Sequence, residues 1–180
     1  MNELTSKRLL LWCITLIAIL SIGQMPPISQ DMTYHNFADT ELLFGIPNAG
    51  NVLSNIPFII VGLYGLWYVS QNRQSLGAFY WGGLTFSLGV SLVGFGSGYY
   101  HWSPNNITLV WDRLPMTIGF MGLYAMIVSA FVKTESGVKI LPWLVLVGLV
   151  SVGYWFITES YGQGDLRWYI LVQFLPMLLI

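Results

Sequence analysis

Three side chains near the middle of the chain could together bind or activate water. Ser97 and His101 are four positions apart, which places them on one face of a helix. If the chain reverses near Asn105 and Asn106, Asp112 comes level with His101 on the antiparallel helix that follows. A hydroxyl, an imidazole and a carboxylate at one point predict a metal site near a membrane face.

Each of these groups also has an ordinary structural interpretation. A single histidine at a membrane interface more often forms hydrogen bonds than binds a metal, and Asp112 could form an ion pair with its neighbour Arg113. Catalytic zinc usually takes three protein ligands. The other histidine, His35, lies in a separate acidic segment, so spacing alone leaves the site incomplete.

The composition indicates that the elements carrying these residues are membrane spans. Hydrophobic residues make up 55% of the chain and charged residues only 8%, whereas soluble domains are about one quarter charged. We expect an all-α, polytopic transmembrane helix bundle with five complete spans plus a truncated sixth, and a chain that lacks one or more C-terminal helices. The expected spans are Leu9–Ile22, Val52–Ser70, Leu76–Trp102, Ile107–Val132 and Ile140–Thr158, with the sixth from Trp168 to Ile180.

We expect one transmembrane domain over residues 1–180. Residues 1–25 would form an N-terminal span or signal anchor, 26–50 an outward acidic loop, and 51–180 the helix bundle, incomplete at its C-terminus. A cleaved signal peptide is the alternative for the first segment, because Lys7 and Arg8 precede a short apolar stretch.

The loop charges predict the orientation of the chain. They sum to +3 on the side of the N-terminus and −4 on the side of the candidate site. The positive-inside rule then places the N-terminus in the cytoplasm and the site on the periplasmic, extracellular or lumenal side.

The long loop after the first span is acidic, and we expect a short helix across Asp39 to Leu43. Its carboxylates could be a solvated face or half of a cation site. Beyond the loop, Asn51, Ser54 and Asn55 form a polar stripe whose side chains need partners inside the bundle.

Some function classes find little support. The few cations are scattered and form no basic patch, so nucleic acid is not an expected partner. A small-molecule transporter is less supported, because inverted repeats are not evident.

The central motif resembles the alkaline ceramidase family, part of a superfamily of seven-helix membrane hydrolases that includes the adiponectin and progestin-type receptors. The similarity lies in the Ser and His of 96–101, in the Asp-x-Leu-Pro-Met sequence of 112–116, and in the Asn-rich stretch 51–55. Segments 34–39 and 45–48 resemble the bacterial branch, which implies a bacterial inner membrane with the site facing outward. The resemblance runs from about residue 31 to residue 116.

The resemblance implies a zinc-dependent amidase that cleaves the N-acyl bond of ceramide-like membrane lipids, giving a fatty acid and a sphingoid base. His101 would be a zinc ligand. Asp112 would handle the proton of the attacking water, and Ser97 would help to hold that water or the developing oxyanion. The family has two further zinc-binding histidines on its last helix; no histidine follows His101 here, which implies that part of the metal site is missing.

The family also suggests a calcium site. Eukaryotic members bind calcium with an Asp-x-x-Glu-x-Asn segment, in which Asp31 and Asn36 match and Tyr34 replaces the glutamate. Asn48 is a further candidate ligand. The alternative function is a non-catalytic membrane receptor or scaffold on the same fold, and the sequence does not indicate an oligomeric state.

Overall fold

The computed structural model describes residues 3–180, and all its regular elements are helices. They are α1 (Glu3–Gln24), a 3-10 helix η1 (Met32–His35), α2 (Ala49–Leu53), α3 (Ile56–Gln71), α4 (Arg73–Leu76), α5 (Phe79–Trp102), α6 (Asn106–Phe131), α7 (Thr134–Ser160) and α8 (Arg167–Leu178).

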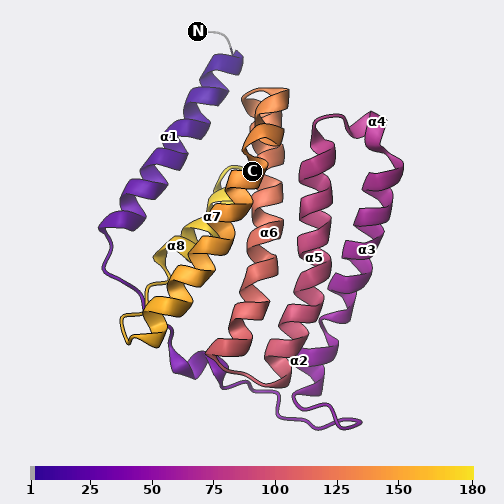
Figure 1. The fold of residues 1–180 in the computed structure, drawn as a ribbon, viewed down its shortest axis with the longest axis vertical. Coiled ribbons are helices and arrows are strands. Elements are labelled where there is room, and N and C mark those ends of the chain that lie inside the picture. Colours follow the sequence, from indigo (N-terminus) through magenta and orange to yellow (C-terminus); the bar gives the residue numbers. More distant parts are fainter. Residues whose placement is uncertain (1–2) are drawn as a thin grey trace.

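The long helices run side by side, and the segment that joins α1 to α2 passes across one end of the bundle (Figure 1). α6 is the most buried of the long apolar helices and lies between α5 and α7, whereas α1 stands at the edge. The segment between α1 and α2 therefore reaches the ends of all the inner helices.

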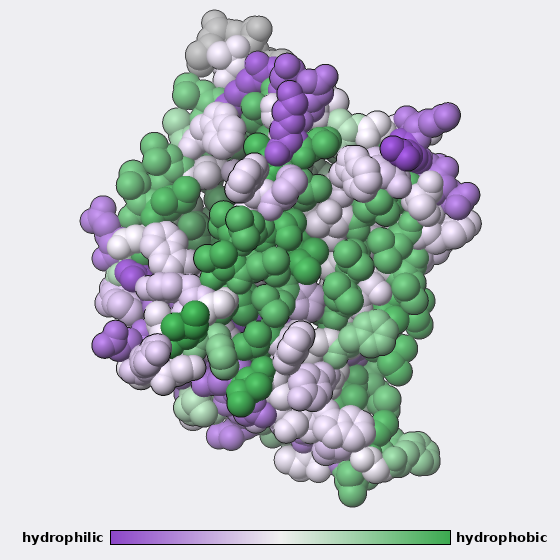
Figure 2. Space-filling view, in the orientation of Figure 1, coloured by the Kyte–Doolittle hydropathy of each residue, from purple (hydrophilic) through white to green (hydrophobic). Residues whose placement is uncertain are grey.

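Five helical stretches are long and apolar enough to cross a membrane, which confirms the predicted polytopic all-α fold. They are Thr5–Gln24, Ala49–Gln71, Phe79–Trp102, Asn106–Phe131 and Thr134–Ser160. Apolar side chains cover much of the middle of the molecule, and strongly hydrophilic residues gather at the top and along the left and lower margins of this view (Figure 2). The chain is a multi-pass membrane protein; α8, with 12 residues, is shorter than these five spans.

The chain reverses between α5 and α6 as predicted, because Asn105 caps α6. Its side chain accepts hydrogen bonds from the backbone N–H groups of Ile107 and Thr108, and the Thr108 hydroxyl accepts one from the backbone of Asn105. Such a capping box satisfies N–H groups that the first helical turn leaves free.

The helix expected across Asp39 to Leu43 is absent, and two residues of the polar stripe find their partner within their own span. Residues 39–43 are not helical, because the Asp39 carboxylate binds the backbone N–H groups of Glu41 and Asn51 in competition with a helix. Ser54 and Asn55 find their partner within their own span: both side chains donate to the carbonyl of Asn51, where α2 gives way to α3.

Candidate functional site

Ser97 and Asp112 lie beside a close backbone contact between α5 and α6. A Cβ atom on Gly96 would collide with the carbonyl oxygen of Trp111, so only glycine permits this approach. The next residue on each helix is a site residue. The Ser97 hydroxyl is hydrogen-bonded to the Asp112 carboxylate, and both residues are buried. Of the three side chains that the sequence predicts to converge, the structure joins Ser97 and Asp112 directly.

His101 lies one turn beyond Ser97, in the last turn of α5. Its ring contacts Phe37, with ring centroids 4.6 Å apart, and its carbonyl oxygen accepts a hydrogen bond of 2.8 Å from the Asn48 side chain. Its Nδ1 atom is buried and has no hydrogen-bond partner. The imidazole therefore keeps one nitrogen available for a ligand inside the bundle.

The site fits a metal only in part. The free Nδ1 of His101 is the kind of donor that zinc takes. Within residues 5–180, however, no group of three or more histidine, cysteine, aspartate or glutamate side chains is placed to hold a metal ion. The described residues thus supply single ligand positions and no closed coordination shell.

The second histidine has a different role from the first. His35 Nδ1 lies 2.9 Å from the Tyr100 hydroxyl, and His35 Nε2 lies 2.9 Å from Oδ1 of Asn106. Both ring nitrogens are therefore occupied, and His35 ties the loop to the end of α5 and the start of α6. Sequence reasoning missed this role, because Tyr100 and Asn106 are remote from His35 along the chain and no local pattern links them.

Arg113 does not form the ion pair with Asp112 that the sequence left open. The ion pairs among the described residues do not include these two side chains. The Arg113 guanidinium instead donates to Oε1 of Gln30 at 2.6 Å and lies over the rings of Trp155 and Tyr169, at 4.1 and 4.9 Å from their centroids. Cation–π contacts of this kind stabilise a buried guanidinium. Arg113 thus joins α6 to α7, α8 and the loop.

The residues considered for calcium already have other hydrogen bonds. Asp31 caps η1 by accepting the backbone N–H of Thr33 at 2.8 Å, which lowers the pKa of Asp31. The backbone of Asn36 closes the same turn, and Asn48 donates to His101. A calcium site at Asp31, Asn36 and Asn48 stays a prediction.

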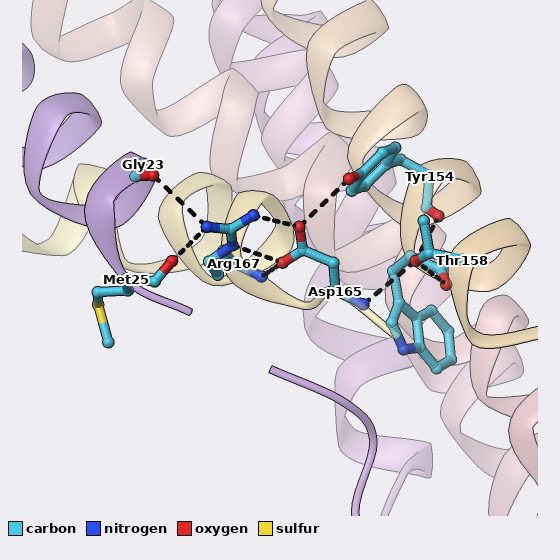
Figure 3. Close-up of polar contacts among 7 residues, drawn as sticks. Gly23, Met25, Tyr154, Thr158, Asp165 and Arg167 are labelled. Carbon is cyan, nitrogen blue, oxygen red and sulfur yellow. Dashed lines mark hydrogen bonds and ion pairs between the residues drawn. The ribbon is translucent and has the colours of Figure 1, made fainter. Parts of the chain in front are cut away.

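A second polar cluster, absent from the sequence prediction, holds α1 to the bundle (Figure 3). Arg167 donates from Nε and Nη2 to the two carboxylate oxygens of Asp165, at 2.8 and 2.7 Å. Its Nη1 donates to the carbonyls of Gly23 and Met25, around the end of α1. The Tyr154 hydroxyl donates to Asp165 at 3.2 Å. The hydrogen bonds from Arg167 hold the pKa of the buried Asp165 below its ordinary value.

Two hollows adjoin the Ser97–Asp112 pair. A cavity of about 310 Å³ has a mixed polar and apolar lining that includes Tyr34, Asp112, Arg113, Tyr169 and Gln173. An apolar groove of about 410 Å³ is lined by residues that include Gly96, Trp111 and Leu149. The polar cavity beside Asp112 thus lies close to an apolar groove that suits an alkyl chain.

Comparison with known proteins agrees with this arrangement. The profile of the ceramidase family matches residues 44–175, which is more than half of the chain and extends well past the motif at 112–116. No curated protein and no solved structure matches the chain. The matched region includes Ser97, His101 and Asp112, and the chain belongs to the ceramidase family.

Proposed function

We propose that this protein is a zinc-dependent hydrolase of the N-acyl amide bond of ceramide-like membrane lipids, releasing a fatty acid and a sphingoid base. Membership of the ceramidase family supports amide hydrolysis and a lipid substrate. The observation that carries the proposal is the buried Ser97–Asp112 contact, with the unpartnered Nδ1 of His101 one helical turn away. The family match does not favour the non-catalytic receptor or scaffold.

Asp112 would act as the proton acceptor for the water that attacks the amide carbon. Its carboxylate is fixed in direction by the Ser97 hydroxyl, which is the kind of positioning that a general base requires. After the attack, the same group would return the proton to the leaving nitrogen.

His101 would hold zinc through Nδ1, because that nitrogen is buried and makes no other bond. Zinc, when bound, would polarise the amide carbonyl and lower the pKa of water. The Asn48 hydrogen bond and the Phe37 ring keep the His101 backbone and imidazole in place.

The groove between Gly96, Trp111 and Leu149 would take an alkyl chain of the substrate, because its lining is almost wholly apolar. The cavity beside Asp112 would take the polar head. The head would then lie near the helix ends while the chain extends into the bilayer.

The charge distribution supports a site that faces outward, and the resemblance to the bacterial branch supports a bacterial inner membrane. The loop that covers the site contains Asp31, Asp39 and Glu41, whereas Lys7, Arg8 and Arg73 belong to the opposite end of the bundle.

The proposal is tested with the chain purified in lipid nanodiscs and supplied with an N-acyl sphingoid lipid. We expect release of fatty acid and base in equal amounts, copurification of zinc, and loss of both with His101→Ala. Ser97→Ala should also reduce hydrolysis. Ser103→Ala is its matched control, because Ser103 is an exposed serine just beyond the end of α5. A His101→Ala variant that hydrolyses the lipid at the parent rate would refute the assignment.

A further inference from the structure

The most exposed apolar side chains of the loop between α1 and α2 gather at the tip of a tight hairpin. Leu43 and Ile46 exchange two backbone hydrogen bonds, of 3.1 and 2.9 Å. Phe44 at the tip is 92% exposed, and Leu42 and Leu43 beside it are 72% and 45% exposed. We call residues 42–46 the apolar hairpin.

The backbone of the apolar hairpin is unusual for its sequence. Phe44 has a φ of 53° and Gly45 a φ of 79°, so both central residues of the turn lie in the left-handed region. Glycine and asparagine suit such positions, whereas a phenylalanine there is strained. An exposed aromatic ring at a strained position contributes little to folding, which indicates that the ring has a contact outside the chain.

The apolar hairpin is held rigidly at the start of a membrane span. The N–H of Ala49, the first residue of α2, donates to the carbonyl of Glu41 at 3.1 Å. The Asp39 carboxylate accepts the N–H of Asn51 at 2.8 Å. In Figure 1 the segment before α2 extends beyond the end of the bundle beside α2 and α3.

The depth of the apolar hairpin corresponds to a membrane boundary. The side chain of Asn48, two residues beyond the hairpin, donates a hydrogen bond to the carbonyl of His101. Trp102, which follows His101, is 48% exposed. Exposed tryptophans at the ends of spans mark the interfacial zone of a bilayer. Leu53 of α2 and Ile56 of α3, further along the same span, are also exposed, at 36% and 47%.

We propose that the apolar hairpin inserts Leu42 and Phe44 into the interfacial zone of the nearest lipid leaflet. The exposed apolar side chains of Leu53 and Ile56, on the span that follows the hairpin, favour lipid over a protein partner. Three side chains are also far fewer than a stable interface with a second copy requires, which is about 800 Å² on each partner. Through Asn48, the inserted hairpin is joined directly to the backbone of His101.

The test measures where Leu42 lies and does not depend on hydrolysis. Cys13, the free cysteine of the described residues, is replaced by serine, and a nitroxide is attached at Leu42→Cys, with Phe44 left in place, in nanodiscs. Ala38→Cys, in an exposed part of the same loop, serves as the control. We expect oxygen, which dissolves in lipid, to relax the spin label at 42 more strongly than a water-soluble nickel chelate, and the reverse at 38.

A second change separates insertion from folding. In the Leu42→Cys background, Phe44→Asn relieves the backbone strain, so we expect a higher unfolding midpoint together with greater exposure of the label to nickel; Phe44→Leu should keep the label in lipid. A label at 42 that is as accessible to nickel as the label at 38 would overturn the proposal. So would a label shielded from both reagents, which would indicate a protein contact.

Discussion

The carbonyl group of Trp111 on α6 lies directly against the Cα atom of Gly96 on α5. This contact brings the following residues, Ser97 and Asp112, within hydrogen-bond reach of each other. Helix interfaces in membranes often use small residues in this way. The distance between the two helices at this point therefore sets the geometry of the site.

Replacing Gly96 by alanine should separate α5 and α6. We expect Gly96→Ala to lower the free energy of unfolding by about 1–3 kcal/mol, the usual cost of overpacking, and to reduce lipid hydrolysis as well. Gly98→Ala is the matched control, because no atom lies within 4 Å of a Cβ at Gly98. That variant should be unchanged or stabilised by about 0.5–1 kcal/mol. The free energy of unfolding of each variant is measured in mixed micelles. Equal changes for Gly96→Ala and Gly98→Ala would contradict a close contact at Gly96.

His35 should stabilise the closed arrangement of the loop over the helix ends. His35→Ala removes the hydrogen bonds to Tyr100 and Asn106, each worth about 0.5–1.5 kcal/mol, so we expect a loss of about 1–3 kcal/mol. A double-mutant cycle with Asn106→Ala isolates one of the two bonds and should give a coupling of about 0.5 kcal/mol or more. Thr40→Ala, in an exposed part of the loop, is the control. Additive effects of the two substitutions would show that this bond does not stabilise the fold.

The attachment of α1 should weaken in acid. Hydrogen bonds from Arg167 lower the pKa of Asp165 in the folded protein below its ordinary value. A group with a lowered folded pKa stabilises the fold fully above its unfolded pKa, and this contribution is lost as the pH falls through the folded pKa. We therefore expect stability to fall below about pH 4.

The unfolding midpoint is measured against pH for the parent and for Asp165→Asn. The variant should have a lower midpoint at neutral pH, and its midpoint should fall less as the pH is lowered below about 4. Glu135→Gln is the control, because the Glu135 ion pairs with Lys133 and Lys139 are exposed, and exposed pairs contribute little. Parallel pH profiles for the parent and Asp165→Asn would exclude Asp165 as the source of the acid sensitivity.

The spans and the antiparallel pairing of α5 with α6 could be predicted from the sequence because both depend on local patterns. Apolar windows determine the spans, and the Asn105 cap with the spacing of Ser97 and Asp112 determines how α5 and α6 face each other. The loop over residues 25–48 could not be predicted in the same way. Its course depends on bonds to remote residues, such as that between Gln30 and Arg113, and the helix expected across Asp39 to Leu43 failed for this reason.

The central claim is that Asp112 transfers the proton in amide hydrolysis. Asp112→Asn preserves the size of the side chain and its ability to accept the Ser97 hydrogen bond, yet it cannot take up a proton. The direct measurement is the release of fatty acid from an N-acyl sphingoid lipid by the parent and variant proteins at equal concentration in nanodiscs. The account predicts a loss of about 100-fold or more with unchanged thermal stability. An Asp112→Asn protein that releases fatty acid at the parent rate would contradict it.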